Sequence, residues 1–415
     1  MEKYKIAVVG YGCRGKGLAE DIVSLFLDRV EVIGICDNIK LRADGGSDFF
    51  EQKTKKRPLS TTDFDDIIAI KPDAVIIATS WQYHVPYACK AMEAGITVAS
   101  EVGGAYSLQQ CYDLIETHER TKTPFMFLEN CCYGRLELLA LNMKKLGLLG
   151  TVVHCEASYK HDLRAEVTCG YDKHHYRLSE YTTRNCDNYP THGLGPIMQI
   201  LDINHGNRPL TLCAMASKAE GLKEYSKEHY AKDHIANNVT YTQGDVVTTL
   251  IKCTGGETIT MKLDTTLPSF YSRGFTVCGT KGGVYEDLRM VFLDGVHSKW
   301  EFSTDKLYNN IKEYYEKYDS DIWREYAKNP VGTHWGIDYL EFADFFDCAI
   351  NDKPMPIDVY DAAIMMAVTP LTEISIARGG APVDFPDFKK GNWIRRYETE
   401  KPILSPEDAK VVIPG

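Results

Sequence analysis

The sequence predicts an α/β protein in two parts: an N-terminal Rossmann domain with a doubly wound parallel sheet, and a C-terminal α/β domain with an open, mainly antiparallel sheet. A short apolar, β-rich run that enters a Gly-x-Gly-x-x-Gly turn, followed by further alternating strands and helices, predicts the first part. Two pairs of β-rich runs joined by Gly-rich turns, at 245–268 and 274–287, are typical of antiparallel hairpins and predict the second part.

The length of 415 residues exceeds what one ordinary core occupies, so several domains are expected. The change of pattern after residue 128 marks the first boundary. We expect a Rossmann domain at 1–128, a substrate-binding α/β domain at 129–350, and a C-terminal helix and tail at 351–415 that pack back on the other domains.

The glycine turn contains Gly10, Gly12 and Gly15 and lies between a predicted strand and a predicted helix. Glycines there allow a tight turn and a close approach of a pyrophosphate, whose charge faces the free N–H groups of the helix start. A second strand, "VEVIGICD", ends in Asp37, which is placed to bind a ribose diol. Because an acid at this point repels a 2′-phosphate, the sequence predicts NAD rather than NADP.

Two more βα units follow, with strands "DAVIIATS" and "ITVASE" and a helix over 85–94. Ligands of such sheets lie at the carboxyl ends of the strands. The residues expected at this edge are Ser80, Trp81, His84, Glu101 and Val102. Two residues leave alternatives open: Trp81 is either a core aromatic or a cofactor contact, and Arg14 is either a solvated loop cation or a phosphate contact.

Composition excludes several classes of function. The net charge of −11 argues against a nucleic-acid partner, and no stretch approaches the length that a membrane-spanning helix needs. The 13 Cys are scattered without a C-x-x-C pair, so we expect reduced thiols, no metal site and a cytoplasmic protein.

Several motifs together carry a resemblance that spans residues 4 to about 388. They are "GYGCRG", "WQYH", "SEV", "LENCCYGR", "YPTHGLGP" and "HWGIDYL". In order and spacing the chain resembles the Gfo/Idh/MocA oxidoreductases, and within them it is most similar to NAD-dependent glycosidases of glycoside hydrolase family 109, whose known activity is α-N-acetylgalactosaminidase. The resemblance implies a small-molecule glycoside as substrate, NAD as cofactor and a homo-oligomer.

One departure from the wider family favours the glycosidases. Sugar and inositol dehydrogenases of this fold carry Glu-Lys-Pro where this chain has Glu101-Val102-Gly103. The Lys helps to remove a hydroxyl proton, which a Val side chain cannot do. The hydrolytic subfamily shares the Val.

The resemblance also implies site residues. Those implied to line NAD, beside the three glycines, are Cys13, Arg14, Asp37, Trp81, His84, Glu101, Val102 and Asn130. Those implied to contact substrate are Tyr159, Arg177, Tyr189, Pro190, Thr191, His192 and Tyr271. Glu129 either contacts substrate or the nicotinamide ribose, or it pairs with Arg135 or caps the following helix.

The implied mechanism oxidises C3 of the sugar transiently, eliminates the leaving group across C1 and C2, adds water and reduces C3 again. His192 suits removal of the C3 hydroxyl proton, since its ordinary pKa is near 6.5. Tyr159 can serve at C2 if its neighbours depress its pKa, and Tyr189 completes the catalytic candidates. Pro190 holds Tyr189 at a set angle. The glycines after His192 allow close approach of a ligand or packing of a helix.

Two other functions compete. A sugar dehydrogenase would stop at a 3-keto-glycoside and accumulate NADH. A non-catalytic NAD-bound sensor would bind NAD without turnover.

Overall fold

The computed structural model describes residues 2–300 and 307–395, which fall into two compact units. Among these residues, unit 1 comprises the chain up to Gly134 and Ile322–Ile364. Unit 2 comprises Arg135–Asp321 and the chain from Met365 onward. The tail that we expected to pack back on the other domains lies, from residue 396 on, outside the described residues.

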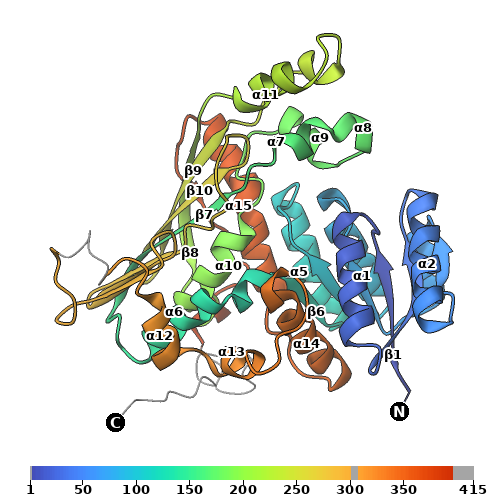
Figure 1. Cartoon of the computed structure of the whole chain (residues 1–415), viewed down its shortest axis with the longest axis horizontal. Helices are drawn as coiled ribbons and strands as arrows, with labels where there is room; N and C mark the ends of the chain where they lie inside the picture. Colours follow the sequence, from blue (N-terminus) through green and yellow to red (C-terminus); the bar gives the residue numbers. More distant parts are fainter. Residues whose placement is uncertain (1, 301–306, 396–415) are drawn as a thin grey trace. The chain divides into compact units, whose positions relative to one another are not determined.

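Unit 1 contains a six-stranded parallel sheet in the order β3-β2-β1-β4-β5-β6 (Figure 1). Its strands are β1 (Tyr4–Val9), β2 (Val30–Cys36), β3 (Leu59–Thr61), β4 (Ala74–Ile77), β5 (Thr97–Glu101) and β6 (Phe125–Leu128). The helices between them are α1 (Cys13–Leu25), α2 (Lys40–Thr54), α3 (Phe64–Ala69), α4 (His84–Glu93) and α5 (Leu108–Thr121), with short 3-10 turns η1 (Trp81–Tyr83) and η2 (Asn130–Tyr133). The order reverses between β1 and β4, and ligands of such sheets bind at this crevice.

A later segment of the chain completes unit 1. It carries α13 (Asp321–Tyr326), η4 (His334–Gly336) and α14 (Ile337–Ile350). Phe26, just after α1, packs its ring against Tyr339 and Phe346 of α14, with ring centroids 5.7 and 5.1 Å apart. Buried aromatic contacts of this kind stabilise the packing of α14 on unit 1. In the structure α14 therefore belongs to the same unit as the parallel sheet, whereas the sequence placed it in the substrate-binding domain.

Unit 2 is built on an eight-stranded sheet in the order β13-β12-β11-β7-β10-β9-β8-β14. The strands are β7 (Val152–Lys160), β8 (Pro209–Ala216), β9 (Val246–Cys253), β10 (Thr258–Asp264), β11 (Thr276–Gly279), β12 (Gly282–Tyr285), β13 (Met290–Leu293) and β14 (Val383–Asp384). Only the β7–β10 pair among these is parallel. The two predicted hairpins, β9–β10 and β11–β12, and the mainly antiparallel sheet are confirmed.

The helices of unit 2 include α10, which packs on the sheet. They are α6 (Arg135–Lys145), α7 (Arg164–Thr168), α8 (Gly170–Lys173), α9 (Arg177–Thr183), α10 (Thr191–Ile200), α11 (Gly221–His229) and α12 (Ile311–Tyr318), with η3 (Ile235–Asn237) and η5 (Asn392–Ile394). A Cβ added at Gly193 of α10 would lie 2.7 Å from the Cβ of Ala157 in β7. Gly193 therefore lets α10 approach the strand closely.

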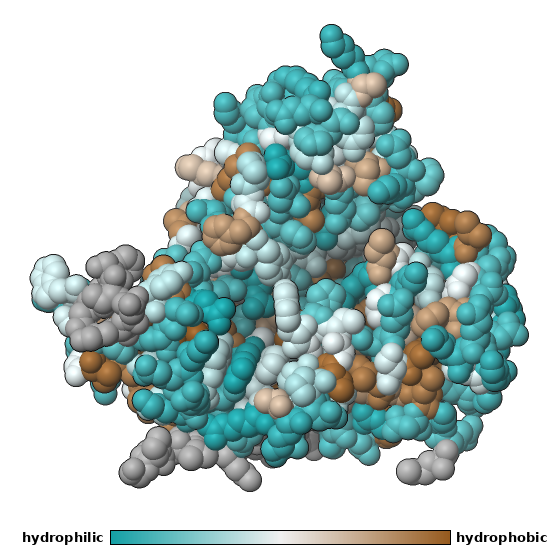
Figure 2. All heavy atoms as spheres, viewed as in Figure 1, coloured by the Kyte–Doolittle hydropathy of each residue, from teal (hydrophilic) through white to brown (hydrophobic). Residues whose placement is uncertain are grey.

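One helix corrects the expectation about apolar stretches. The helix α15 (Val359–Ala377) is long and apolar enough to cross a membrane, but 72% of its most apolar 18-residue stretch is buried in the protein, as in the core helix of a globular domain. On the face drawn in Figure 2, hydrophilic residues cover most of the surface and hydrophobic ones form small scattered groups. All 13 cysteines are free thiols.

Candidate active site

The glycine turn of unit 1 has the form that a dinucleotide needs. Gly10 has φ of +94°, and a Cβ on it would lie 2.5 Å from the carbonyl oxygen of Ala78. A Cβ on Gly15, in the first turn of α1, would lie 1.9 Å from the oxygen of Gly10, so the helix can pass this close to the glycine turn only without a side chain at this position. Gly12 precedes α1 and has no side-chain cap, which leaves the first N–H groups of the helix for an anion.

Asp37 is fixed beside this turn, directly after β2. Its Oδ2 accepts the N–H of Tyr11 at 2.7 Å, and its Oδ1 accepts the N–H of Ile39 at 2.8 Å. Each carboxylate oxygen can accept a further hydrogen bond, so the side chain can still bind the two hydroxyls of a ribose. The turn and Asp37 together fit NAD.

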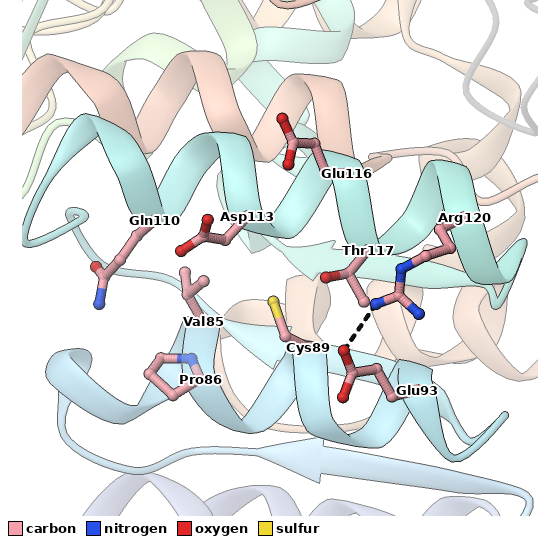
Figure 3. Close-up of a pocket in the computed structure, with 9 residues that line it drawn as sticks. All are labelled: Val85, Pro86, Cys89, Glu93, Gln110, Asp113, Glu116, Thr117 and Arg120. Carbon is pink, nitrogen blue, oxygen red and sulfur yellow. Dashed lines mark hydrogen bonds and ion pairs between the residues drawn. The ribbon is translucent and has the colours of Figure 1, made fainter.

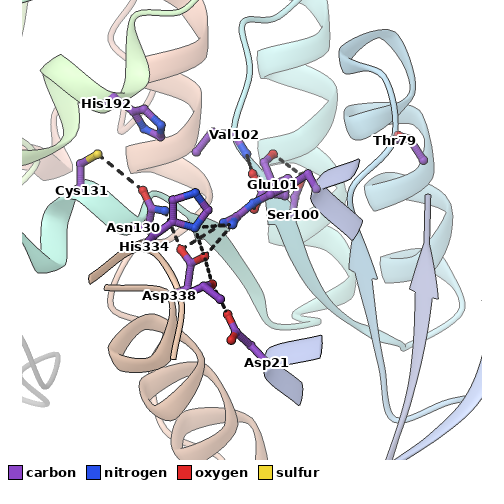
Figure 4. A network of polar contacts seen from close by, with 12 residues as sticks. Asp21, Thr79, Ser100, Glu101, Val102, Asn130, Cys131, His192, His334 and Asp338 are labelled. Carbon is purple, nitrogen blue, oxygen red and sulfur yellow. Dashed lines mark hydrogen bonds and ion pairs between the residues drawn. The ribbon is translucent and has the colours of Figure 1, made fainter. Parts of the chain in front are cut away.

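Arg14 does not act as a solvated loop cation. Its Nε donates to Oε1 of Glu101 at 2.5 Å, and its Nη1 donates to Oδ2 of Asp338 at 2.6 Å. Asp338 also accepts from Asn130 Nδ2 at 2.7 Å and contacts His334 Nδ1 at 2.7 Å (Figure 4). We call these five residues the Arg14 cluster. The contact of Arg14 with a phosphate stays a prediction.

Charge dominates the Arg14 cluster. Burial by itself would raise the pKa of Asp338, but its hydrogen bond with His334 and the charge of Arg14 overcome this and hold the pKa well below the ordinary value. Asp338 has no exposed surface. Neighbouring Glu341 is also fully buried, and burial next to Asp338 and Glu101 raises its pKa well above the ordinary value.

The other residues expected at the strand ends are buried. Trp81 is 4% exposed and packs as a core aromatic, since a Cβ on Gly103 would lie 2.3 Å from its ring. His84 contacts the carbonyl oxygen of Thr79 at 2.9 Å, and burial lowers its pKa to about 4, so it is neutral at pH 7. Val102 is 3% exposed. Their contacts with NAD stay predictions.

In unit 2, the structure brings the expected substrate residues together around Tyr159, at the end of β7. The ring of Tyr159 lies 4.5 Å from that of Tyr189, 5.7 Å from that of His192 and 6.4 Å from that of Tyr271, measured between centroids. The guanidinium carbon of Arg177 lies 5.0 Å from the Tyr189 ring centroid. We call these five residues and His161 the Tyr159 cluster.

The motif at the start of α10 sets the angle between two of these rings. Pro190 has φ of −77° and directly precedes α10, and Thr191 is fully buried. The rings of Tyr189 and His192 are nearly perpendicular, at 88°, and Tyr189 Oη lies 3.4 Å from His192 Nε2. The helix start therefore presents a phenol and an imidazole as one unit.

The condition that we set for Tyr159 as a base is not met. Burial raises its pKa above the ordinary value for a phenol, and the opposing charge of Arg177 is the smaller effect. Tyr159 is 7% exposed. Its hydroxyl keeps its proton at neutral pH and contacts Nδ1 of His161 at 2.9 Å.

Three residues of these clusters were not predicted as site residues: His161, His334 and Asp338. His161 follows Tyr159 by two positions, the spacing at which side chains of an extended chain point to the same side. Asp338 lies in the first turn of α14, and His334 lies in the preceding turn η4, where His334 and Trp335 have positive φ, so no helical spacing along the sequence indicates their contact. Neither contact can be recognised without the fold.

Unit 1 also has a separate pocket, which is lined by none of the residues predicted to bind NAD or substrate. It lies between α4 and α5 and has a volume of about 480 Å³ (Figure 3). Its lining residues are Val85, Pro86, Cys89, Glu93, Gln110, Asp113, Glu116, Thr117 and Arg120. Arg120 and Glu93 form an ion pair of 2.7 Å across it.

Two family models match the chain. Residues 4–128 match the oxidoreductase family with an NAD-binding Rossmann fold, and residues 133–395 match the C-terminal domain of glycosyl hydrolase 109. The first match establishes NAD as the cofactor type of the N-terminal domain.

Curated relatives point the same way. An α-N-acetylgalactosaminidase of Tannerella forsythia is 39% identical over 346 residues, which cover 78% of this chain and 72% of the relative. An α-N-acetylgalactosaminidase of Shewanella oneidensis is 34% identical, over 95% of this chain and 86% of the relative.

Solved structures share the fold. An NAD-binding oxidoreductase from Klebsiella pneumoniae has a TM-score of 0.69 at 16% identity, covering 93% of this chain and 100% of the other. A scyllo-inositol dehydrogenase from Lactobacillus casei, solved with NAD(H) and scyllo-inositol, has a TM-score of 0.63 at 14% identity, covering 92% and 99%.

Proposed function

Since the chain belongs to glycosyl hydrolase family 109, we propose that it is an NAD-dependent glycosidase that cleaves α-linked N-acetylgalactosaminides. The observation that carries the proposal is the Tyr159 cluster, in which five residues expected to contact substrate lie side by side in unit 2. The relatives named as α-N-acetylgalactosaminidases support the choice of sugar.

The residues of unit 1 hold the cofactor in this proposal. The N–H groups at the start of α1 bind the pyrophosphate, and Asp37 binds the ribose hydroxyls. When bound, NAD would supply a hydride acceptor for the transient oxidation of C3 of the sugar to a ketone. Because Val102 cannot hold or move a proton, the proton steps fall to residues of unit 2.

His192 takes the proton of the C3 hydroxyl, and its contact with Tyr189 orients the imidazole. Tyr159 takes the proton from C2 and later returns one there, because the C2–H group is acidic once C3 is a ketone. Aromatic faces in the same cluster provide a surface on which the apolar face of a sugar ring packs.

The test uses aryl α- and β-glycosides of N-acetylgalactosamine, N-acetylglucosamine and galactose, incubated with the NAD-loaded enzyme in D2O. We expect release of the leaving group from the α-N-acetylgalactosaminide, no net NADH and deuterium at C2 of the product. Stoichiometric NADH without cleavage would instead identify a sugar dehydrogenase. NAD binding without turnover on any glycoside would identify a sensor.

We also propose a homo-oligomer in the cytoplasm. Leu250 of β9 and Met215 of β8, 50% and 65% exposed, lie on the outer face of the sheet and support self-association. The 13 free thiols support a reducing compartment. Sedimentation of the protein and of a Leu250→Lys variant tests the first point, and cell fractionation tests the second.

A further inference from the structure

The proposed cycle sets a problem at Tyr159. The group that takes the C2 proton must have a vacant proton site, but burial keeps the Tyr159 phenol protonated at neutral pH. A protonated phenol can take a proton only if it passes its own to a neighbour at the same time. The neighbour must be an acceptor in hydrogen-bond contact with the hydroxyl.

His161 meets the geometric requirement. Its Nδ1 lies 2.9 Å from Tyr159 Oη, a normal distance for a phenol that donates to an imidazole nitrogen. The two rings are at 82° to each other. A donated proton would therefore have a short, direct path to Nδ1.

The backbone holds this imidazole in place. The N–H of His161 donates to the carbonyl oxygen of Asp264 at 3.0 Å, and the N–H of Leu163 donates to that of Thr265 at 3.0 Å. The His161 ring also packs edge to face on Tyr271, with centroids 5.2 Å apart. The segment after β7 is thus fixed by the end of β10 and by one aromatic neighbour.

From this geometry we propose that His161 is the terminal acceptor of the C2 proton, acting through Tyr159. The inference rests on the proposed function. As the C2–H bond breaks, Tyr159 Oη takes the proton and its own proton moves to Nδ1 of His161. The electron pair of the C2–H bond forms the enolate of the C3 ketone and then the C1=C2 double bond, while the C1–O pair leaves with the aglycone. After water adds at C1, the same two transfers run in reverse and return a proton to C2.

The charges around His161 suit an acceptor. Burial is the largest effect and lowers the pKa of His161, and the charges of Arg177 on α9 and His192 on α10 lower it further. The carboxylates of Glu166 on α7 and of the adjacent Asp162 act in the opposite direction. The imidazole is therefore neutral at pH 7 and can accept a proton. Glu166 and Asp162 then face the imidazolium that forms.

A merely structural role for His161 makes different predictions. If the imidazole only holds the Tyr159 hydroxyl in place, a Gln that keeps an acceptor should preserve the rate. If it receives the proton, Gln should fail, because an amide does not titrate in this range. His161→Gln is therefore the informative variant.

The strand offers a matched control. His154 lies on β7, outside the Tyr159 cluster, where its Nδ1 contacts Thr258 Oγ1 at 2.8 Å. His154→Gln makes the same chemical change away from the substrate residues. We expect it to keep the wild-type rates.

The experiment follows two steps separately with an aryl α-N-acetylgalactosaminide in D2O: NADH absorbance in a single turnover, and deuterium incorporation at C2 by NMR. For His161→Gln we expect C2 exchange to fall about 100-fold or more, the usual size of a lost general-base contribution, while NADH still forms. In the wild type we expect C2 exchange to decline toward low pH as His161 protonates, and in His161→Gln we expect this decline to be absent. Wild-type exchange in His161→Gln, or loss of NADH formation together with exchange, would overturn the proposal.

A second measurement needs neither variant nor substrate. In 15N NMR spectra of the wild-type protein, we expect His161 to carry its hydrogen on Nε2, with Nδ1 as the acceptor. An Nδ1–H tautomer would overturn the relay. Absence of any cleavage or C2 exchange in the wild type would instead remove the proposed function, so the two failures are distinguishable.

Discussion

The Arg14 cluster of unit 1 and the Tyr159 cluster of unit 2 differ in the protonation of their buried titratable groups. In the Arg14 cluster, full charges are paired at short range, and the pKa of the buried Asp338 is held low. In the Tyr159 cluster, burial raises the pKa of the phenol and lowers that of His161, so both groups are neutral at pH 7. The first arrangement fixes charge next to a cofactor turn, and the second leaves protons that can move.

The largest effect is expected where a mobile proton is lost. His192→Ala should reduce turnover by about 10³-fold, within the range for a removed acid or base, and leave NAD binding unchanged because the glycine turn and Asp37 are untouched. Steady-state rates and a fluorescence titration with NADH measure the two quantities. A variant with near-normal turnover would exclude His192 from the chemistry.

Removing a paired charge from the Arg14 cluster should lower the free energy of unfolding. Asp338→Asn removes one of the two carboxylates that pair with Arg14, and breaking a buried pair typically costs about 3 kcal/mol of unfolding free energy. The control is Asp48→Asn, which removes an exposed partner of Arg57 and should cost less than about 1 kcal/mol. Denaturant unfolding compares them, and equal losses would contradict the role assigned to charge pairing.

A third effect, measured as a change of stability with pH, concerns Asp187, which lies just before the start of α10. Burial raises its pKa to about 7, although the N–H of Tyr189 opposes this. A carboxyl whose folded pKa is raised stabilises fully below its unfolded pKa, near 3.9, and loses that contribution as the pH rises toward 7. Asp187→Asn should remove a slope of at most about 1.4 kcal/mol per pH unit between pH 4 and 7. Melting curves across this range test it, and an unchanged slope would show that Asp187 is ionised throughout.

Unit 1 shows how far the sequence alone could go. Its strands have strong local patterns, and they lie within the predicted runs because buried parallel strands are continuously apolar and bounded by turns, although β4 ends at Ile77 where the run continues to Ser80. Asp37 was found because its place relative to the glycine turn is fixed along the chain. Asp338 could not be predicted from the sequence, because it contacts Arg14 only once α14 has packed against α1.

Unit 2 shows the limit more clearly. The resemblance located Tyr159 and His192, but the direction in which the Tyr159 pKa moves depends on burial that no motif encodes. The His161 contact depends on how the chain leaves β7, which the end of β10 controls. The parallel β7–β10 pair likewise has no local signal, because the pairing of strands far apart in the chain leaves no pattern within either strand.

That parallel pair has a consequence for the order in which the chain is made. The central strand β7 ends at Lys160, whereas its two neighbours, β10 and β11, begin at Thr258 and Thr276. At a synthesis rate of about 5–20 residues per second, β7 waits roughly 5 to 20 s with both edges unpaired. Tyr159 and His161 therefore reach their working positions late in translation, and until then both edges of β7 are open to pairing with another chain.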